Sequence, residues 1–437
     1  MRSRLLAAGT LLVSAAVAWL SITVPLAARL LQGVVVVSML YVGYLAYRGW
    51  RTMRADLRRT DGEAAPTERW VTLVVPASNE AAVIEDVVRD LVAQDYADER
   101  GPCFDVIVVD DGSADGTGDL ARAAALPLGD RISVLRREPD AGAATKAAVL
   151  EWVAPQVRGE VLGVIDADAR ADPDFLRRVM HAWRADPSAA AIQAQRRTMN
   201  RHHSWLPAAQ DEELLMDMTS QCGRWVTDGT AELRGNGMFL RRAVLEAIGG
   251  WSESAITEDL EISTRLTAAG HHVALAPAAE LREEAIERVG PLWRQRMRWA
   301  EGSMRRLMEH GPSLLADVRL PIGRRLDFLL FVTEFVVPPL FVMAIAASLL
   351  NLPTAAVGHW TVAVSLFLGY GLGTYLLALG GLAAHGERGL RLVGRAARGS
   401  LFLSHWLLVV PVALFRIALL PPSSVFVQTP RHRRRSD

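Results

Sequence analysis

Two aspartates follow an apolar run in the segment VLGVIDADARADPDFL, which covers Val161–Leu176. Asp166 and Asp168 are two residues apart, and side chains at that spacing on an extended segment point the same way. Carboxylate oxygens are the ligands that hard divalent cations prefer, and Mg²⁺ or Mn²⁺ in such sites is usually shared with substrate phosphates. The pair therefore predicts a cation that Asp166 and Asp168 hold and that bridges to a diphosphate.

Polar clusters also end two earlier apolar runs. The triplet Ser78-Asn79-Glu80 follows the first run, and Asp110-Asp111-Gly112-Ser113 ends the second. Helix capping or turn formation would account for the two serines. It accounts less well for the aspartates, because four acids gathered at one edge repel each other. The sequence therefore predicts a positive partner for them.

Short β-branched runs alternate with helical patterns between about residues 70 and 310. The expected strands are Trp70–Ala77, Asp105–Gly112, Arg131–Arg137 and Val161–Asp168. The expected helices are Glu80–Gln94, Thr117–Leu126 and Thr145–Val157. This alternation predicts an α/β domain with a parallel sheet and right-handed crossovers. Ligands of such sheets bind beyond the carboxyl ends of the strands, so the three polar clusters should meet in one crevice.

Apolar segments frame this α/β region. Leu5–Pro25 and Leu30–Ala46 carry no charge, and each is long enough, or nearly so, to cross a membrane. The first segment alone would suit a signal peptide. The second follows it without a polar start of a mature protein, which favours a hairpin of two membrane helices.

Three more apolar segments follow the α/β region: Phe328–Leu350, His359–Ala384 and Leu401–Leu420. Basic residues at 51–59 and in the loop 385–399 indicate that these regions and the central domain are cytoplasmic, and that the uncharged loop 351–358 is outside. Three full crossings would put the basic tail RHRRRSD outside as well, against the same rule. Two alternatives stay open: the last segment, with Pro411 and Arg416, is re-entrant or interfacial, or the tail breaks the rule.

Charge and cysteine content narrow the class of protein. Lys and Arg together number 48, as do Asp and Glu, so no net positive field predicts a nucleic acid partner. Cys103 and Cys222 show no metal-binding spacing and are typical of a reducing compartment.

The motifs and their order resemble those of membrane-bound, inverting family 2 glycosyltransferases. They are VVPASNE (74–80), VIVVDDGSADGT (106–117), DAGAATKAAVL (140–150), DADA (166–169), ITEDLEIS (256–263) and QRMRW (295–299). The resemblance runs from about Thr72 to Leu307 and implies a Rossmann-like GT-A domain with a mostly parallel sheet, inserted between membrane helices. The chain departs from the family at Ala143, Ala144 and Thr145, where glycine is common.

The resemblance also implies a role for each motif. Asp259 is the expected general base, with Glu258 beside it as a second catalytic residue, and Asp166 and Asp168 are the expected metal ligands. The acceptor-binding residues are Gly235, Asn236 and Trp299. The residues that bind the nucleotide sugar are Pro76, Ala77, Asn79, Glu80, Asp110, Asp111, Lys146, Asp166, Gln295 and Arg298.

The chemistry of these residues is consistent with sugar transfer. Inversion needs one base to take the proton of the acceptor hydroxyl, and Glu258, Asp259 and Glu261 compete for this role. Acids that open a helix also favour its dipole without any catalytic role. Lys146 and Arg298 suit a leaving diphosphate. The flat face of Trp299 suits a sugar ring, and the alternative is that it anchors the domain to the membrane surface.

We expect six regions: two membrane helices in 1–50, a basic linker in 51–69, the GT-A domain in 70–312, an interfacial segment on membrane lipids in 313–326, about three membrane segments in 327–421 and a basic tail in 422–437. The predicted function is transfer of a hexose, glucose above all, from a UDP-sugar to a lipid such as diacylglycerol. The enzyme would lie in the cell membrane with its catalytic domain in the cytoplasm. The alternative is a processive synthase of a β-linked polysaccharide of the poly-N-acetylglucosamine, hyaluronan or cellulose type, with a glycan acceptor.

Overall fold

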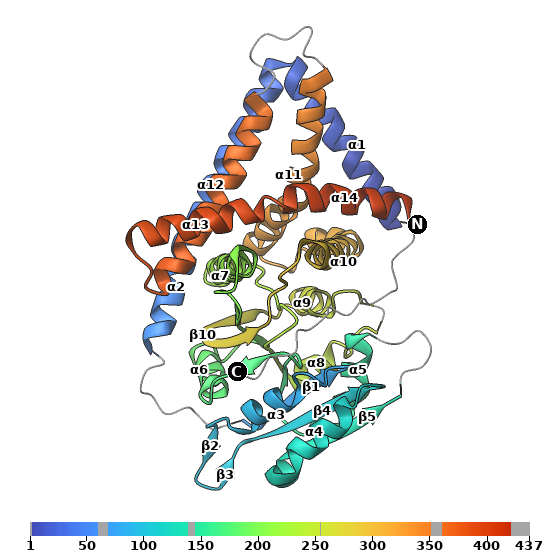
Figure 1. The fold of residues 1–437 in the computed structure, drawn as a ribbon. Coiled ribbons are helices and arrows are strands. Elements are labelled where there is room, and N and C mark those ends of the chain that lie inside the picture. Colours follow the sequence, from blue (N-terminus) through green and yellow to red (C-terminus); the bar gives the residue numbers. More distant parts are fainter. Residues whose placement is uncertain (1, 60–68, 139–144, 254, 351–360, 421–437) are drawn as a thin grey trace. The chain divides into compact units, whose positions relative to one another are not determined.

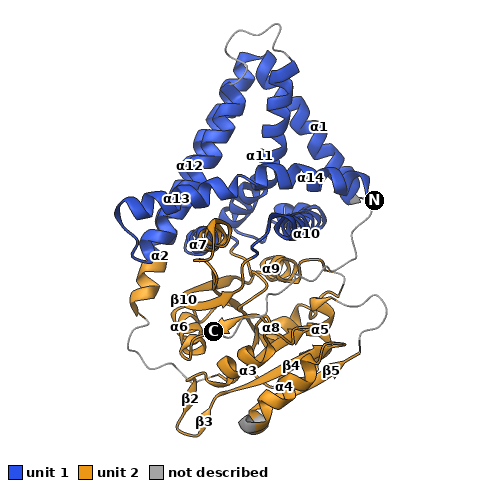
Figure 2. Ribbon diagram, viewed as in Figure 1, with its two compact units in different colours: residues 1–52, 215–230, 286–424 blue, residues 53–214, 231–285, 425–437 orange. Residues whose placement is uncertain are grey.

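A computed structural model describes residues 2–59, 69–138, 145–253, 255–350 and 361–420 of the chain. Two compact units divide these residues (Figure 2). Unit 1 contains residues 1–52, 215–230 and 286–424, and unit 2 contains residues 53–214, 231–285 and 425–437. Both units thus combine segments that lie far apart in the sequence, and the six linear regions given above stay a prediction.

Unit 2 is built on an eight-stranded sheet with the strand order β5-β4-β1-β6-β9-β8-β10-β7 (Figure 1). The strands are β1 (Val71–Ala77), β4 (Phe104–Asp111), β5 (Ile132–Arg137), β6 (Val161–Val164), β7 (Arg170–Ala171), β8 (Ala191–Thr198), β9 (Met238–Arg241) and β10 (Val273–Glu283). A separate two-stranded ribbon joins β2 (Ala97–Asp98) to β3 (Gly101–Pro102).

The sheet is mostly parallel, which confirms the predicted fold class. Strands β5, β4, β1 and β6 run parallel, as do β8 and β10. Strand β9 is antiparallel to β6 and β8, and β7 is antiparallel to β10. Strands β1, β4 and β6 are buried along most of their length, as their unbroken apolar runs predict, whereas the edge strand β5 is partly exposed.

Among the described helices, six belong wholly to unit 2, and two are shared by both units, α7 (Trp205–Trp225) and the long helix α2 (Pro25–Arg59), which passes from unit 1 into unit 2 after residue 52. The six are α3 (Ile84–Val92), α4 (Thr117–Ala125), α5 (Lys146–Val153), α6 (Phe175–Ala185), α8 (Arg242–Ala247) and α9 (Glu258–Ala268). Short 3-10 helices at Leu126–Arg131 and Ala154–Gln156 follow α4 and α5. Helices α3, α4 and α5 match the three predicted ones, but they are shorter.

One predicted strand was wrong in length. The segment expected to be extended to Asp168 leaves the sheet after Val164, and Asp166 O accepts a hydrogen bond from Ala169 N (3.0 Å). Asp166 and Asp168 therefore lie in a turn. The backbone of this segment is not extended, so it does not align their side chains in the predicted way.

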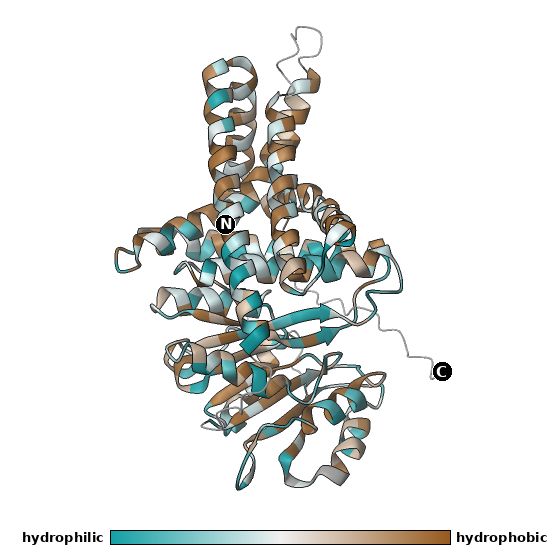
Figure 3. Cartoon of the chain, turned by 90° about the vertical axis from the view of Figure 1, so that its left-hand side faces the viewer, coloured by the Kyte–Doolittle hydropathy of each residue, from teal (hydrophilic) through white to brown (hydrophobic). Residues whose placement is uncertain are grey.

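Unit 1 consists mainly of helices, and several of them are rich in apolar residues (Figure 3). They are α1 (Arg2–Thr23), α2 up to residue 52, the second half of α7, α10 (Val289–Ala316), α11 (Ile322–Leu350), α12 (Thr361–Ala384), α13 (Gly389–Leu403) and α14 (Trp406–Leu419). Within the described ranges, five stretches are long and apolar enough to cross a membrane: Ser3–Thr23, Pro25–Arg59, Ile322–Leu350, Thr361–Ala384 and Gly389–Leu419. The prediction of a loop at residues 385–399 is wrong, because most of this segment forms helix α13.

Glycines bring three helices of unit 1 into backbone contact. A Cβ on Gly49 of α2 would lie 2.0 Å from the carbonyl oxygen of Thr219 on α7. A Cβ on Gly223 of α7 would lie 2.4 Å from the carbonyl oxygen of Leu45, and one on Gly381 of α12 would lie 2.6 Å from Thr219 Oγ1. Small residues permit such close packing between helices in a membrane. The second half of α7 is thereby held between α2 and α12.

A buried carboxylate joins α2 and α7 to α11. Asp327 is 5% exposed and accepts hydrogen bonds from Tyr41 Oη (2.5 Å) and Thr230 N (2.7 Å). The Nε of Arg224 lies 3.1 Å from Asp327 Oδ2. Because the carboxylate is both paired and hydrogen-bonded, its burial is compensated.

Substitution of Gly49 by alanine should destabilise unit 1. The new Cβ overlaps a backbone oxygen that cannot move without shifting α7, and overpacking of this kind costs about 1–3 kcal/mol. Thermal unfolding of the purified full-length protein, followed by intrinsic fluorescence, should show a lowered midpoint.

Gly33 on the same helix is the matched control, because a Cβ there meets nothing within 4 Å. Gly33→Ala should leave the midpoint unchanged or raise it slightly, since alanine favours helix more than glycine does. Equal midpoints for the two variants would contradict the close contact of α2 with α7.

Candidate active site

The side chain of Lys146 joins three loops at one edge of the sheet in unit 2. This residue opens α5, where Thr145 accepts a capping hydrogen bond from Ala148 N (3.1 Å). Its Nζ lies 2.5 Å from Asp166 Oδ1, 2.6 Å from the carbonyl oxygen of Gly235 and 3.6 Å from Glu258 Oε1. The ammonium group thus connects the turn after β6, the glycine loop before β9 and the start of α9.

The charges around this ammonium favour its protonated form. Burial alone would lower the pKa of Lys146, but the carboxylates of Asp166 and Glu258 outweigh it and raise the pKa well above its usual range. Lys146 is also the only lysine in the sequence, in which every other residue counted as Lys or Arg is arginine. The sequence shows that this lysine is unique, and the predictions above did not use that fact. A compact ammonium can meet three oxygens from three directions, whereas a guanidinium is a planar fork.

Gly235 allows the glycine loop to approach α9. Its φ is +77°, which L-residues with a side chain rarely adopt, and a Cβ there would lie 3.3 Å from Asp259 Oδ2. The loop backbone therefore runs beside the Asp259 carboxylate.

Three acids in the first turn of α9 have different surroundings. Glu261 forms a two-pronged pair with Arg265 (2.7 and 2.8 Å), which occupies its carboxylate. Burial raises the pKa of Glu258 to about 7, although Lys146 opposes the shift. Burial also raises the pKa of Asp259, and the positive charges of Arg234, Lys146 and Arg196 oppose it. Two carboxylates thus remain at the site, and both hold protons more tightly than ordinary acids.

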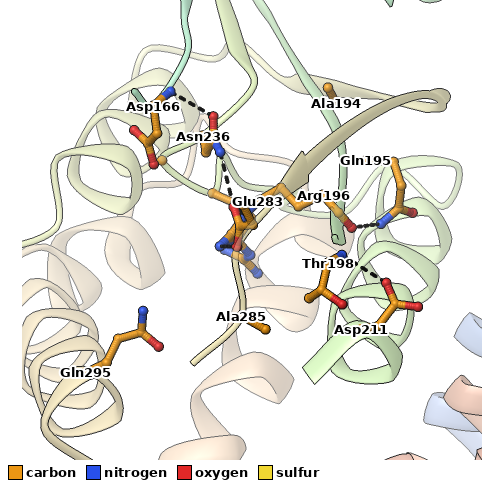
Figure 4. A network of polar contacts seen from close by, with 12 residues as sticks. Asp166, Ala194, Gln195, Arg196, Thr198, Asp211, Asn236, Glu283, Ala285 and Gln295 are labelled. Atoms are coloured by element: carbon orange, nitrogen blue, oxygen red, sulfur yellow. Dashed lines mark hydrogen bonds and ion pairs between the residues drawn. The ribbon is translucent and has the colours of Figure 1, made fainter. Parts of the chain in front are cut away.

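A chain of polar contacts fixes the backbone of Asp166 (Figure 4). Asp166 N donates to Asn236 Oδ1 (3.0 Å), and Asn236 Nδ2 donates to Glu283 Oε2 (3.1 Å). Glu283 in turn pairs with Arg196 (2.6 Å). Asn236 is 1% exposed, so its amide is used inside unit 2 and orients the Asp166 turn. The acceptor role predicted for Asn236 stays a prediction.

Neighbouring arginines offset the acids that end β4. The register places Asp110 opposite Arg136 and Asp111 opposite Arg137 at the ends of β4 and β5. Arg136 Nη1 lies 3.1 Å from Asp110 Oδ2, and Arg137 Nη1 lies 2.5 Å from Asp111 Oδ1. Asp110 is fully buried, and its Oδ1 also accepts a hydrogen bond from Ser113 N (3.1 Å). The positive partner that the sequence demands is thus supplied in part by the protein. Sequence reasoning missed both arginines, although they end the predicted strand 131–137.

Hydrogen bonds link the loops that follow β1 and β4. Asn79 has a φ of +54°; its backbone N donates to Ser113 Oγ and its Oδ1 accepts from Ala114 N (3.0 Å each). Glu80 N donates to Thr117 Oγ1 (2.8 Å). Pro76 and Ala77 end β1, and Ala77 lies opposite Asp110. The two predicted clusters therefore lie side by side, as parallel strand ends require.

The two predicted metal ligands differ in exposure. The Asp166 side chain is 37% exposed, whereas Asp168 is 5% exposed. Among the described residues, no group of three or more His, Cys, Asp and Glu side chains is placed to hold a metal ion. Two carboxylates still fit Mg²⁺ or Mn²⁺, because such ions take one or two protein carboxylates and complete their shell with phosphate and water.

The residues of QRMRW lie on α10 in unit 1. Gln295, Arg298 and Trp299 are each partly exposed there. The guanidinium of Arg296 stands 4.2 Å from the ring centre of Trp299 and 5.9 Å from that of Trp406 on α14. This cation–π contact uses the Trp299 indole, the same ring that was predicted to pack against a sugar. Sequence reasoning did not identify Arg296.

Comparison with known proteins identifies the family of the chain. The model of the family described as "Glycosyltransferase like family 2" matches residues 66–302, which is more than half of the chain. The chain belongs to this family. It is 31% identical over 401 residues to the beta-monoglucosyldiacylglycerol synthase of Synechocystis sp., covering 89% of this chain and 81% of that protein. The Trichormus variabilis enzyme of the same name is 29% identical, covering 82% of this chain and 76% of that enzyme.

Two further likenesses are weaker. The poly-beta-1,6-N-acetyl-D-glucosamine synthase of Staphylococcus aureus is 23% identical, covering 64% of this chain and 66% of that protein. The mannosyltransferase PcManGT of Pyrobaculum calidifontis, solved in complex with GDP-Man and Mn²⁺, matches with a TM-score of 0.57 and 21% identity over 88% of this chain and 99% of that one. The structural likeness supports the GT-A fold.

Gly235→Ala should reduce glycosyl transfer far more than it reduces stability. The added methyl group crowds the Asp259 carboxylate and strains a backbone with positive φ. Initial rates with a saturating donor, measured beside the unfolding midpoint, test this expectation.

Gly249→Ala is the matched control. Gly249 also has a positive φ (+91°), but a Cβ there meets nothing within 4 Å. Both variants should lose similar stability, and only the first should lose most of its turnover. Similar activities would show that the contact of Gly235 with α9 has no role in the reaction.

Proposed function

We propose that this glycosyltransferase moves glucose from UDP-glucose, with inversion, onto diacylglycerol in the cell membrane. The similarity to the Synechocystis enzyme over 89% of the chain carries the proposal. The apolar helices of unit 1 support it, because a lipid acceptor needs an enzyme that reaches the bilayer. The basic end of α2 supports a cytoplasmic position for unit 2.

The donor would bind at the carboxyl ends of β1, β4 and β6. Asn79, Asp110 and Asp111, with the adjacent Pro76, Ala77 and Glu80, would accommodate the uridine. Lys146 would bind the diphosphate with its ammonium group, which its acidic neighbours keep charged. Donor binding would therefore require Lys146 to share its contacts with the phosphate oxygens.

Asp259 would be the general base. The acceptor oxygen would attack the anomeric carbon as the bond from that carbon to the diphosphate oxygen breaks, and the hydroxyl proton would pass to Asp259. Burial raises the pKa of this carboxyl and so makes its anion a stronger proton acceptor. The carboxyl group of Glu258 would lie beside the Lys146 ammonium as a second group that can bind a proton.

A divalent cation would be held by Asp166 and Asp168. Mg²⁺ or Mn²⁺ at that place would neutralise charge on the departing diphosphate. The protein contributes by fixing the turn: Asn236 and Lys146 hold Asp166 in place before any ion binds.

Residues of α10 and of the glycine loop would contact the remaining parts of the substrates. Gln295 and Arg298 would bind the donor, and Gly235, Asn236 and Trp299 would lie on the acceptor side. The Arg296 contact supports a fixed orientation for the Trp299 indole.

A polysaccharide synthase is the second candidate. The similarity to the Staphylococcus aureus enzyme favours it, but that similarity is lower in identity and covers less of the chain. Both candidates would use the same base and donor site.

The purified full-length protein, supplied with UDP-glucose, diacylglycerol and Mg²⁺ or Mn²⁺, should form one short, lipid-soluble product with a single added hexose. Mass spectrometry of the lipid fraction identifies it. A long water-soluble polymer would instead establish the second candidate.

The same assay contains its controls. UDP-N-acetylglucosamine in place of UDP-glucose tests the donor, and chelation followed by return of one ion tests the cation. Failure to consume any UDP-sugar under all these conditions would refute both candidates.

Asp259→Asn should lower turnover by about 10²–10⁴-fold, because an amide cannot accept the proton. Binding of UDP-glucose, measured by titration calorimetry, should persist. The matched control is Glu261→Gln, which removes a carboxylate from the same helical turn while leaving the base intact. A loss of donor binding in Asp259→Asn, or an equal loss of turnover in Glu261→Gln, would count against the base assignment.

A further inference from the structure

Two helices, α13 and α14, follow each other directly in the last described part of the chain. Helix α13 has 15 residues and α14 has 14, which corresponds to lengths of about 21–23 Å at 1.5 Å per residue. Neither spans the ~30 Å hydrocarbon core alone, whereas the 31 residues Gly389–Leu419 together are long enough to do so, and the direction of the two helices therefore decides between the alternatives. Ser404 and His405 join the two helices with helical backbone dihedrals, and Leu407 N and Leu408 N bond there to the carbonyl oxygens three residues back. In Figure 1 both run across the direction of α11 and α12.

One face of this pair is anchored within unit 1. Ser400 of α13 contacts Thr374 Oγ1 (2.8 Å), and Tyr370 Oη donates to Leu403 O (3.0 Å), which ties α13 to α12. The buried side of α14 belongs to a cluster with residues of α1 and α10, among them Leu11, Met297 and Met304. Helix α10 also carries buried charged residues such as Arg296 and Glu301, which is unusual for a helix surrounded by lipid.

The opposite face of each helix is an exposed apolar stripe. On α13 it contains Leu390 (90% exposed), Val393 (49%) and Leu401 (65%). On α14 it contains Leu408 (58%), Val412 (41%), Phe415 (45%) and Leu419 (73%). The spacing of three, four, seven and eleven residues puts each set on one side of its helix. We call these residues the outer stripe.

Arginines border the outer stripe on one flank. The flank of the stripe on α13 contains Arg391, Arg395 and Arg398. At 3.6 residues per turn, Arg416 lies on the same flank of the stripe on α14. The Arg391 side chain is 74% exposed and lies 3.5 Å from Glu387, which also pairs with the less exposed Arg395 (2.5 Å). Arg391 and the exposed Arg416 are therefore the arginines most open to headgroups. An apolar stripe with a basic border matches acyl chains beside anionic headgroups.

We propose that α13 and α14 lie in the plane of the membrane surface, with the outer stripe among acyl chains and the bordering arginines at anionic lipid headgroups. The chain then crosses the membrane four times, through α1, α2, α11 and α12. After α12 it stays on the side where α2 ends and α11 begins. The arginines at 431–435 then agree with the positive-inside rule, which resolves the conflict in the sequence in favour of an interfacial last segment.

Depth measurements on the full-length protein in liposomes with anionic lipid test this proposal. In a background with Cys103→Ala and Cys222→Ala that retains its unfolding midpoint, single cysteines replace Leu408, Phe415 and Leu419 and receive spin labels. All three labels should collide more often with oxygen than with a water-soluble nickel complex, and at the same depth. A label at Arg391, on the polar border, is the matched control and should show the opposite preference.

Three results would overturn the proposal. A depth that changes steadily from position 408 to 419 indicates a crossing helix. Shielding of all the labels from both reagents indicates that protein, such as a second copy of this chain, covers the outer stripe. Free access of the nickel complex indicates water.

The side on which the chain ends gives an independent measurement. A cysteine added after Asp437 should react with an impermeant maleimide from the same side as Ser133→Cys in unit 2, and from the side opposite to Val24→Cys between α1 and α2. Labelling together with Val24→Cys would contradict the four-crossing topology. Neither measurement depends on the substrates, so its failure would leave the proposed function intact.

Discussion

One ammonium group holds the candidate active site together. Lys146 meets a carboxylate, a backbone carbonyl and a second acid from three separate loops, and without it these oxygens would repel one another. Burial makes unpaired charges costly, so the group that neutralises them also determines where the loops sit. The positions of Asp166 and Glu258 both depend on this contact, and the glycine loop is drawn toward α9 by the same interaction.

The features that the sequence predicts best follow from periodicity. Alternating strands and helices indicate a parallel sheet, and parallel strands end at one edge, so the polar clusters at Asn79 and Asp110 had to be neighbours. The family resemblance adds the acids of α9, which no local pattern connects to the sheet edge. Comparison with known proteins confirms the family and the fold.

Other features depend on contacts that sequence patterns do not encode. The contacts between Glu283 and both Arg196 and Asn236 join strands and loops far apart in the chain. The turn at Asp166 begins where an apolar run becomes polar, and composition does not tell whether the backbone stays extended there. The same limit applies to Leu401–Leu420, where an apolar average does not show that α14 has one buried and one exposed face.

The single lysine has a practical consequence for the chemistry that can be done on this protein. Reagents that acylate side-chain amines have one target in the whole sequence, and that amine lies at the candidate donor site. Because its acidic neighbours keep it protonated, it is a weak nucleophile and should resist such reagents in the folded state. Acylation at this one position therefore reports directly on whether the surrounding loops are intact.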